Sequence, residues 1–264
     1  MAPRTRVSIG NRLVWYSQQP DEEYWHDHWS ASATPERYRS ARENDLSRDE
    51  LGSLILTFLQ REGRLLEAGC GSGQYVAALS AAGFDVDGVD SSYRLVKLVN
   101  EIEPALAIRH ADVLAMTEPD GYYQSYLSIG VVEHREAGPL PFLTEAHRLL
   151  APHGRAVISV PANGPLRRSK ARLRMFPREP PKALSFYQYG FTPREISSIV
   201  EDAGFKVHRT VYTGLHRLLS EEIPGYQRAT NLRGGTRLLK DPASRMFSGL
   251  DGHMVVVLAE RRPS

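Results

Sequence analysis

Cysteine and long apolar segments are scarce in this sequence. Its 264 residues include one cysteine, Cys70, which excludes an internal disulfide and a zinc site built from several cysteines. No apolar run approaches the roughly 18 residues of a membrane-spanning helix. No apolar stretch follows the early arginines, as it would in a secretory signal. We therefore expect a cytoplasmic protein that does not cross a membrane.

An excess of charge of either sign is also absent. The 33 Lys and Arg residues nearly balance the 31 Asp and Glu residues, and the net charge is only +2. This balance gives no indication of a nucleic-acid partner. Hydrophobic residues make up 41% and charged residues 24%, which excludes a collagen-like, coiled-coil or wholly disordered chain. The length suits one large domain.

Strand-like and helix-like segments alternate along the chain. Seven short apolar runs predict strands, at residues 65–68, 84–89, 107–110, 125–132, 155–160, 205–212 and 254–259. Helical periodicity between most of them favours an α/β fold, with a parallel sheet that helices cover on both faces. Capping signals mark two helix starts, at Ser47 with Glu50 and at Thr192 with Glu195.

Two long segments interrupt this alternation. Residues 161–190 contain seven Lys and Arg residues against one acid, Glu179, and residues 214–253 separate the last two strands. Loops of this length are functional or disordered more often than not. We predict an N-terminal lid segment at 1–45, followed by one domain at 46–264 with insertions at 161–190 and 214–253.

A glycine-rich stretch follows the first predicted strand of this domain. Gly69, Gly71 and Gly73 let a ligand approach the backbone, and amides at the next helix start suit a negative group. A dinucleotide fingerprint would need glycine where Gln74 stands, which disfavours a nicotinamide dehydrogenase. Asp90 ends the next strand about 20 residues later, where an acid can accept hydrogen bonds from a ribose diol.

These residues resemble the class I S-adenosylmethionine (SAM)-dependent methyltransferases, in their small-molecule branch. The similar motifs lie at residues 65–73, 86–90, 112–113, 128–134, 149–154 and 191–205. The resemblance implies a Rossmann-like, seven-stranded, mostly parallel sheet with helices on both faces and an antiparallel last strand. It also implies SAM as cofactor and S-adenosylhomocysteine as product.

The resemblance also implies a set of cofactor-binding residues. They are Glu67, Gly69, Cys70, Gly71, Gly73, Asp90, Ser91, Asp112, Val113, Ile129 and Gly130. In such a site Asp90 binds the ribose, Asp112 accepts from the adenine amino group, and an ionised Glu67 organises the loop near the methionine amine. The alternatives are a helix cap for Asp90, turn chemistry for Asp112 and a partner of loop amides for Glu67. Cys70 is most simply a small residue between glycines.

Aromatic residues gather near the N-terminus, at Tyr24, Trp25, His26, His28 and Trp29. Because aromatic faces attract a sulfonium, we include Tyr24 and Trp25 among the cofactor-binding candidates. The alternative is that these rings only dock the N-terminal segment. No third ligand stands near His26 and His28, so we predict no metal site.

Candidates for catalysis and acceptor binding follow the fourth and fifth strands. His134 is the candidate general base and acceptor ligand, because it lies just past a strand end where open α/β sheets bind ligands. Tyr187 and Tyr189 are predicted to face the acceptor, and Arg167 and Arg168 to bind an anionic one. The alternatives are a histidine that only fixes its loop, tyrosines that pack the insertion, and a solvated basic loop.

The sequence therefore predicts an enzyme that transfers the methyl group of SAM to O or N of a small-molecule acceptor by in-line displacement. The basic stretch adds the hypothesis of an anionic or sugar-linked acceptor. RNA or protein methylation stays open, although no Asn/Asp-Pro-Pro-Tyr run follows the fourth strand. A SAM-binding partner subunit without catalysis also stays open. The acceptor, the methylated atom, the oligomeric state and the pathway are not predicted.

Overall fold

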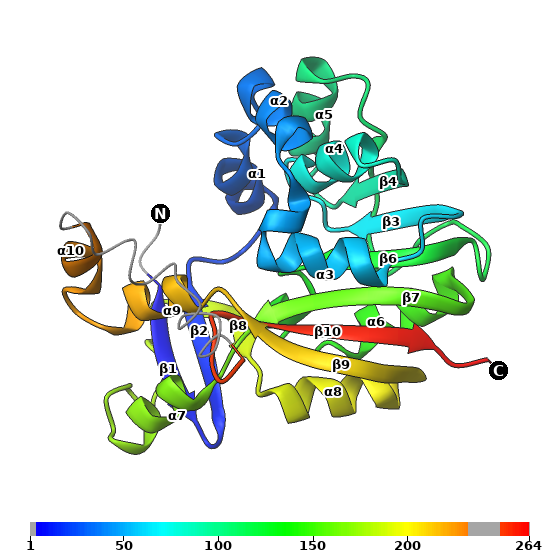
Figure 1. Ribbon diagram of the computed structural model, residues 1–264. Coiled ribbons are helices and arrows are strands. Elements are labelled where there is room, and N and C mark those ends of the chain that lie inside the picture. Colours follow the sequence, from blue (N-terminus) through cyan, green and yellow to red (C-terminus); the bar gives the residue numbers. More distant parts are fainter. Residues whose placement is uncertain (1–3, 232–248, 264) are drawn as a thin grey trace.

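The computed structural model describes residues 4–231 and 249–263. Its main sheet has seven strands: β3 (Arg64–Ala68), β4 (Asp85–Asp90), β5 (Ile108–His110), β6 (Tyr123–Ile129), β7 (Leu150–Pro161), β9 (Phe205–Thr213) and β10 (Met254–Arg261). Their order across the sheet is β5-β4-β3-β6-β7-β10-β9. Figure 1 shows this twisted sheet through the centre of the molecule.

Strand direction agrees with the predicted topology. Parallel pairs join β5 to β4, β4 to β3, β3 to β6 and β6 to β7, whereas β10 runs antiparallel to both β7 and β9. The predicted seven-stranded, mostly parallel sheet with an antiparallel last strand is confirmed. Parallel strands bring their carboxyl ends to one edge, which is where open α/β sheets bind ligands.

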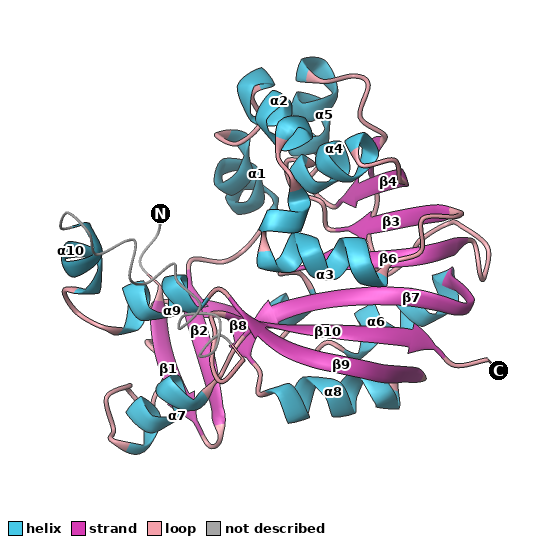
Figure 2. Ribbon diagram, in the orientation of Figure 1, coloured by secondary structure: helices cyan, strands magenta, loops and turns pink. Residues whose placement is uncertain are grey.

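Helices cover both faces of this sheet (Figure 2). One apolar cluster includes residues of α3 (Glu50–Phe58), α4 (Gln74–Ala81) and α5 (Tyr93–Ile102), and the other includes residues of α6 (Leu140–Leu149) and α8 (Pro193–Asp202). Successive residues of a strand point to opposite faces, so Leu65 joins the first cluster and Leu66 the second. Each is fully buried and contributes about 2 kcal/mol to folding.

A smaller sheet, which we call the accessory sheet, stands beside the main one (Figure 1). It consists of β1 (Thr5–Ile9), β2 (Arg12–Ser17) and β8 (Ser185–Gly190), paired antiparallel in the order β1-β2-β8. The sequence analysis did not predict it. The N-terminal segment therefore contains a hairpin as well as α1 (Glu22–Ser30) and α2 (Pro35–Glu43).

The two long segments that interrupt the alternation contain regular structure. Residues 161–190 include α7 (Pro165–Arg172) and β8, and residues 214–253 begin with α9 (Leu215–Glu222) and α10 (Tyr226–Asn231). Residues 232–248 of the second segment lie outside the described residues. Within the described residues no helix is both long and apolar enough to cross a membrane.

One of the two predicted caps is correct and the other is wrong. Thr192 caps α8, because its hydroxyl accepts a hydrogen bond from the Glu195 N–H at 3.2 Å. The cap of α3 is Asp49, which accepts from the Gly52 N–H at 2.8 Å. Ser47 instead lies in a short 3-10 helix, η1 (Leu46–Arg48), where its N–H donates to Asp45.

Candidate active site

A single carboxylate fastens the glycine loop to the neighbouring strand. Asp90 Oδ2 accepts a hydrogen bond from the Gly71 N–H at 2.9 Å, and its Oδ1 accepts from the Ser92 N–H at 3.0 Å. Asp90 is only 8% exposed, and burial raises its pKa against the lowering effect of these amide donors. The glycine loop and the end of β4 therefore form one connected surface.

A cavity of about 230 Å³ opens at this surface, beside the carboxyl ends of β3, β4 and β6. It is lined by Trp25, Trp29, Gly69, Asp90, Ser91, Asp112, Val113, Leu114, Ile129, Gly130, Val131, His134 and Phe142. The fold thus brings most of the predicted cofactor residues to one cavity together with the predicted base. The cofactor candidates that do not line it are Tyr24, Glu67, Cys70, Gly71 and Gly73.

Packing within the protein leaves little room for a side chain at Gly71 or Gly73. Both have positive φ angles, 54° and 73°. A Cβ at Gly71 would lie 3.1 Å from the Trp29 ring, and a Cβ at Gly73 would collide with the Ile108 side chain. Trp29 therefore covers the glycine loop from α1, and Gly73 is needed for packing of the loop against β5.

An aromatic cluster continues from α1 to the accessory sheet. The Trp25 ring lies 4.8 Å from the His134 ring and 6.1 Å from the Tyr187 ring, centroid to centroid. Tyr24 packs behind them, 5.7 Å from Tyr187, and accepts a hydrogen bond from Arg4 at 2.8 Å. The sequence analysis named Trp29 only as a member of this cluster. Its spacing of four residues from Trp25, which places both on one helix face, was the available signal.

The accessory sheet orients the predicted base. His134 Nδ1 lies 2.8 Å from the Tyr187 carbonyl oxygen on β8, and burial lowers the pKa of His134 to about 4. The neutral imidazole must then donate from Nδ1, a tautomer assigned from this hydrogen bond. The lone pair consequently resides on Nε2, which is 3.8 Å from Glu133 Oε1.

Comparison of the chain with known proteins identifies its family. A family model described as "Methyltransferase domain" matches residues 38–210, a range that contains the glycine loop, Asp90, Asp112 and His134. The chain belongs to this methyltransferase family. The prediction of a class I SAM-dependent methyltransferase, with SAM as its cofactor, is confirmed.

Curated relatives cover only part of this methyltransferase. A probable S-adenosylmethionine-dependent methyltransferase of Mycolicibacterium smegmatis is 26% identical over 147 residues, which is 56% of this chain and 53% of that protein. A ubiquinone biosynthesis O-methyltransferase of Caulobacter sp. is 34% identical over 101 residues, 36% of this chain and 40% of that protein. The chain thus spans about half or less of the length of these relatives.

Solved structures share the fold of this methyltransferase at low sequence identity. A chain of the complex between the Haloferax volcanii Trm112 methyltransferase activator and a methyltransferase has a TM-score of 0.59 and 16% identity, over 92% of this chain and 99% of that chain. A Thermotoga maritima SAM-dependent methyltransferase, a "possible histamine N-methyltransferase", has a TM-score of 0.56 and 17% identity, over 92% and 100%. These similarities establish the fold alone.

The cavity of this methyltransferase fits its cofactor. Asp90 and Asp112 line the cavity at the ends of neighbouring strands, where carboxylates can accept hydrogen bonds from a ribose and an adenine amino group. The faces of Trp25 and Trp29 suit a sulfonium. Within the described residues no group of three or more His, Cys, Asp or Glu side chains is arranged to hold a metal ion.

Two arginines predicted as acceptor ligands lie elsewhere. Arg167 is fully buried, with Nε 2.9 Å from a Glu222 oxygen and Nη2 3.1 Å from a Glu221 oxygen. Arg168 lines a different cavity beside the turn between β1 and β2. The prediction for Arg167 is therefore corrected, because a guanidinium held by two carboxylates of α9 has no free face for an acceptor.

The two predicted tyrosines also differ in position. Tyr187 is buried and contributes its backbone carbonyl to His134, as described above. Tyr189 donates its hydroxyl hydrogen to the Glu136 carbonyl at 3.0 Å and packs against the main core. Neither side chain lines the cavity, so the contribution of Tyr187 is through its backbone.

Two buried carboxyl groups flank the methyltransferase site, Glu67 on β3 and Glu133 in the short 3-10 helix η2 (Val132–His134) after β6. Burial raises the pKa of Glu67 to about 8 and that of Glu133 to about 8. One oxygen of each, Oε2, has no hydrogen-bond partner among the described residues. Desolvation thus favours the protonated form of Glu67, whereas the sequence analysis expected an ionised carboxylate.

The raised pKa of Glu67 predicts a pH-dependent stability. Its ordinary value is 4.5, so the unfolded chain loses this proton first, and the stabilisation present below pH 4.5 is lost as pH rises through about 8. We expect Glu67→Gln to reduce this loss, which is on the order of 4 kcal/mol. Urea unfolding at pH 5 and pH 8 measures it. Glu62→Gln, an exposed control, should keep the wild-type slope, and an unchanged slope in Glu67→Gln would contradict the assignment.

Proposed function

We propose that this protein transfers the methyl group of SAM to an oxygen or nitrogen atom of a small-molecule acceptor. The observation that carries the proposal is one cavity that combines Asp90 and Asp112 with His134 and two tryptophan rings. Groups suited to bind the cofactor and a group that can accept a proton thus line the same partly enclosed cavity. Such an arrangement suits in-line transfer, which needs a positioned nucleophile and the exclusion of water.

Each residue of the cavity has a proposed task. Asp90 and Ser91 would hold the ribose, and Asp112 with Val113 would hold the adenine. Trp25 and Trp29 would form the lid that the sequence predicted for the N-terminal segment, since both extend from α1 to the cavity. Bound SAM supplies an electrophilic methyl group on a sulfonium, and the neutral thioether S-adenosylhomocysteine is the leaving group.

His134 would act as the general base toward the acceptor hydroxyl. Because Nδ1 is engaged by the Tyr187 carbonyl, Nε2 is the nitrogen that can accept a hydrogen bond from an acceptor hydroxyl. Its pKa of about 4 keeps the imidazole neutral, and therefore able to accept, throughout the physiological range. A base of this strength assists best when the hydroxyl loses its proton late, as the new O–C bond forms.

The cavity walls favour an acceptor with an aromatic or apolar body. Leu114, Val131 and Phe142 line the cavity together with the two tryptophans, and none of its lining residues is Lys or Arg. An anionic or sugar-linked acceptor therefore receives no support from the described cavity. A hydroxylated aromatic molecule matches these walls, in keeping with the O-methyltransferase names of two partial relatives.

Methyl transfer from labelled SAM tests the proposed class of acceptor. We expect label in a small-molecule extract and none in an RNA pool or in unfolded protein. Label in RNA or protein alone would replace the proposed acceptor class. Binding of S-adenosylhomocysteine without turnover on any of these pools would indicate a non-catalytic partner subunit instead.

The His134→Asn variant separates catalysis from loop support. The asparagine amide can keep a hydrogen bond to the Tyr187 carbonyl but offers no nitrogen lone pair at the position of Nε2. We expect kcat to fall by about 10²-fold or more, with affinity for S-adenosylhomocysteine unchanged. The His147→Asn variant, on α6 away from the cavity, serves as control. Full activity in His134→Asn would mean that His134 only fixes its loop.

A further inference from the structure

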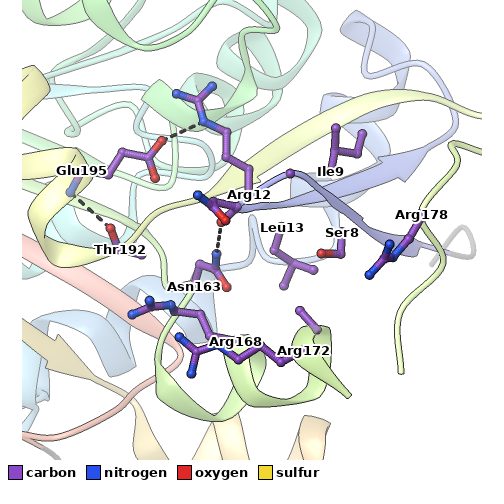
Figure 3. A pocket seen from close by; sticks show the side chains of 13 residues that line it. Ser8, Ile9, Arg12, Leu13, Asn163, Arg168, Arg172, Arg178, Thr192 and Glu195 are labelled. Carbon is purple, nitrogen blue, oxygen red and sulfur yellow. Dashed lines mark hydrogen bonds and ion pairs between the residues drawn. The ribbon is translucent and has the colours of Figure 1, made fainter. Parts of the chain in front are cut away.

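A second cavity lies beside the turn of the accessory sheet and shares no lining residue with the cofactor cavity. Its volume is about 680 Å³, and its walls come from the β1–β2 turn, from α7 and from the start of α8. This volume is within the range of small-molecule sites. Figure 3 shows the side chains that surround it.

Four arginines line this second cavity and one acid accompanies them. They are Arg12, Arg168, Arg172 and Arg178, and the acid is Glu195. Arg12 forms an ion pair with Glu195 at 2.8 Å, which leaves the positive charge of the other three without compensation there. The side chains of these three form no hydrogen bond or ion pair with any residue in 4–231 or 249–263.

Neighbouring cations of the same segment are neutralised. Arg167 and Lys170, on the other side of α7, form ion pairs with Glu222, as does Arg6 on β1. The unpaired arginines therefore do not reflect a general lack of acids in this region. Arg6, Arg167 and Lys170 thus have acidic partners, whereas Arg168, Arg172 and Arg178 have no acidic partner among the residues that the structure describes.

The backbone holds these arginines around a common space. Arg168 and Arg172 are four residues apart on α7 and so lie on one face of that helix. Arg178 follows Pro177, whose carbonyl accepts a hydrogen bond from the Ser8 N–H at 2.8 Å and so ties this segment to the edge of β1. In Figure 3, Arg178 lies across Ser8 and Leu13 from Arg168 and Arg172.

We propose that this cavity is a binding site for a small molecule that carries a diphosphate or an equivalent pair of phosphate groups. Guanidinium groups bind phosphate oxygens through paired, charge-assisted hydrogen bonds. Three uncompensated guanidinium groups match the charge of a diphosphate better than that of one carboxylate. The site is separate from methyl transfer, so it does not depend on the proposed function.

Calorimetric titration of the full chain with inorganic pyrophosphate tests the proposal. We expect saturable binding that weakens at high salt, and at least about tenfold weaker binding in the double variant Arg172→Gln/Arg178→Gln. Both residues are exposed, so the fold should tolerate the change. The matched control is Arg209→Gln, an exposed arginine on β9 outside the cavity, which should bind as the wild type does.

Three outcomes would overturn the proposal. They are no pyrophosphate binding at low salt, equal loss in the control, and binding only to phosphatidylglycerol vesicles, which would indicate a lipid surface in place of a soluble ligand. Stabilisation by S-adenosylhomocysteine should be the same in all these variants. That measurement distinguishes a failure here from a failure of the cofactor site.

Discussion

Replacing Asp90 with alanine should abolish the thermal stabilisation that S-adenosylhomocysteine gives to the wild-type protein. The carboxylate lines the cavity and would accept two hydrogen bonds from the ribose, each worth about 1.5–3 kcal/mol. The variant also loses the acceptor of the Gly71 and Ser92 amides, which frees the glycine loop. We expect an affinity loss on the order of 100-fold or more.

Two measurements make this result specific. Asp85→Ala removes an exposed carboxylate from the opposite end of β4 and should leave ligand stabilisation unchanged. Circular dichroism of unliganded Asp90→Ala should show a folded protein. If that folded variant still gains the full stabilisation, Asp90 does not hold the ribose.

The second large effect is expected from Arg167. Its guanidinium also donates to the Ala162 carbonyl at 2.6 Å and lies 5.5 Å from the Trp15 ring centre. Burial opposes ionisation of Glu222, but hydrogen bonds from Lys170 and Arg167 outweigh this cost and lower the pKa of that carboxyl. Arg167→Met leaves a buried carboxylate and a carbonyl with fewer partners, and should cost about 3 kcal/mol of stability.

Denaturant unfolding of Arg167→Met, with Arg168→Met as the control, measures this cost. Arg168 is the next residue of α7 but is exposed, so its replacement should change stability by less than about 0.5 kcal/mol. Equal losses in the two variants would contradict a structural role for the buried ion pairs. Combining Arg167→Met with Glu222→Gln should cost less than the sum of the single changes.

The main sheet and the cofactor end of the site were accessible from the sequence. The apolar run 125–132 predicted β6, although this strand spans Tyr123–Ile129, because short apolar runs between helical segments are a local pattern. Asp90 and Asp112 could be found because Asp90 ends β4 and Asp112 follows the end of β5 by two residues, and parallel topology gathers such side chains at one edge. Both acids could therefore be located from the sequence, because each lies next to a recognisable strand.

The accessory sheet was predictable only in part. Ile9 pairs with Arg12 across Gly10 and Asn11, a two-residue turn with glycine at positive φ, and this hairpin signal was present in the sequence. The third strand, β8, lies far along the chain, and its pairing with β2 has no local signal. The same limit applies to Arg167, whose partners on α9 are more than fifty residues away.

The contact between His134 and the Tyr187 carbonyl has a consequence for mutations of the site. It ties the proposed base to a sheet assembled from two distant parts of the chain, whereas Asp90 and the glycine loop lie at the ends of main-sheet strands. Mutations in the hairpin or in β8 would therefore move the His134 imidazole and leave Asp90 and Asp112 in place on the main sheet. The proposed acceptor side of the cavity can thus change separately from the proposed cofactor side.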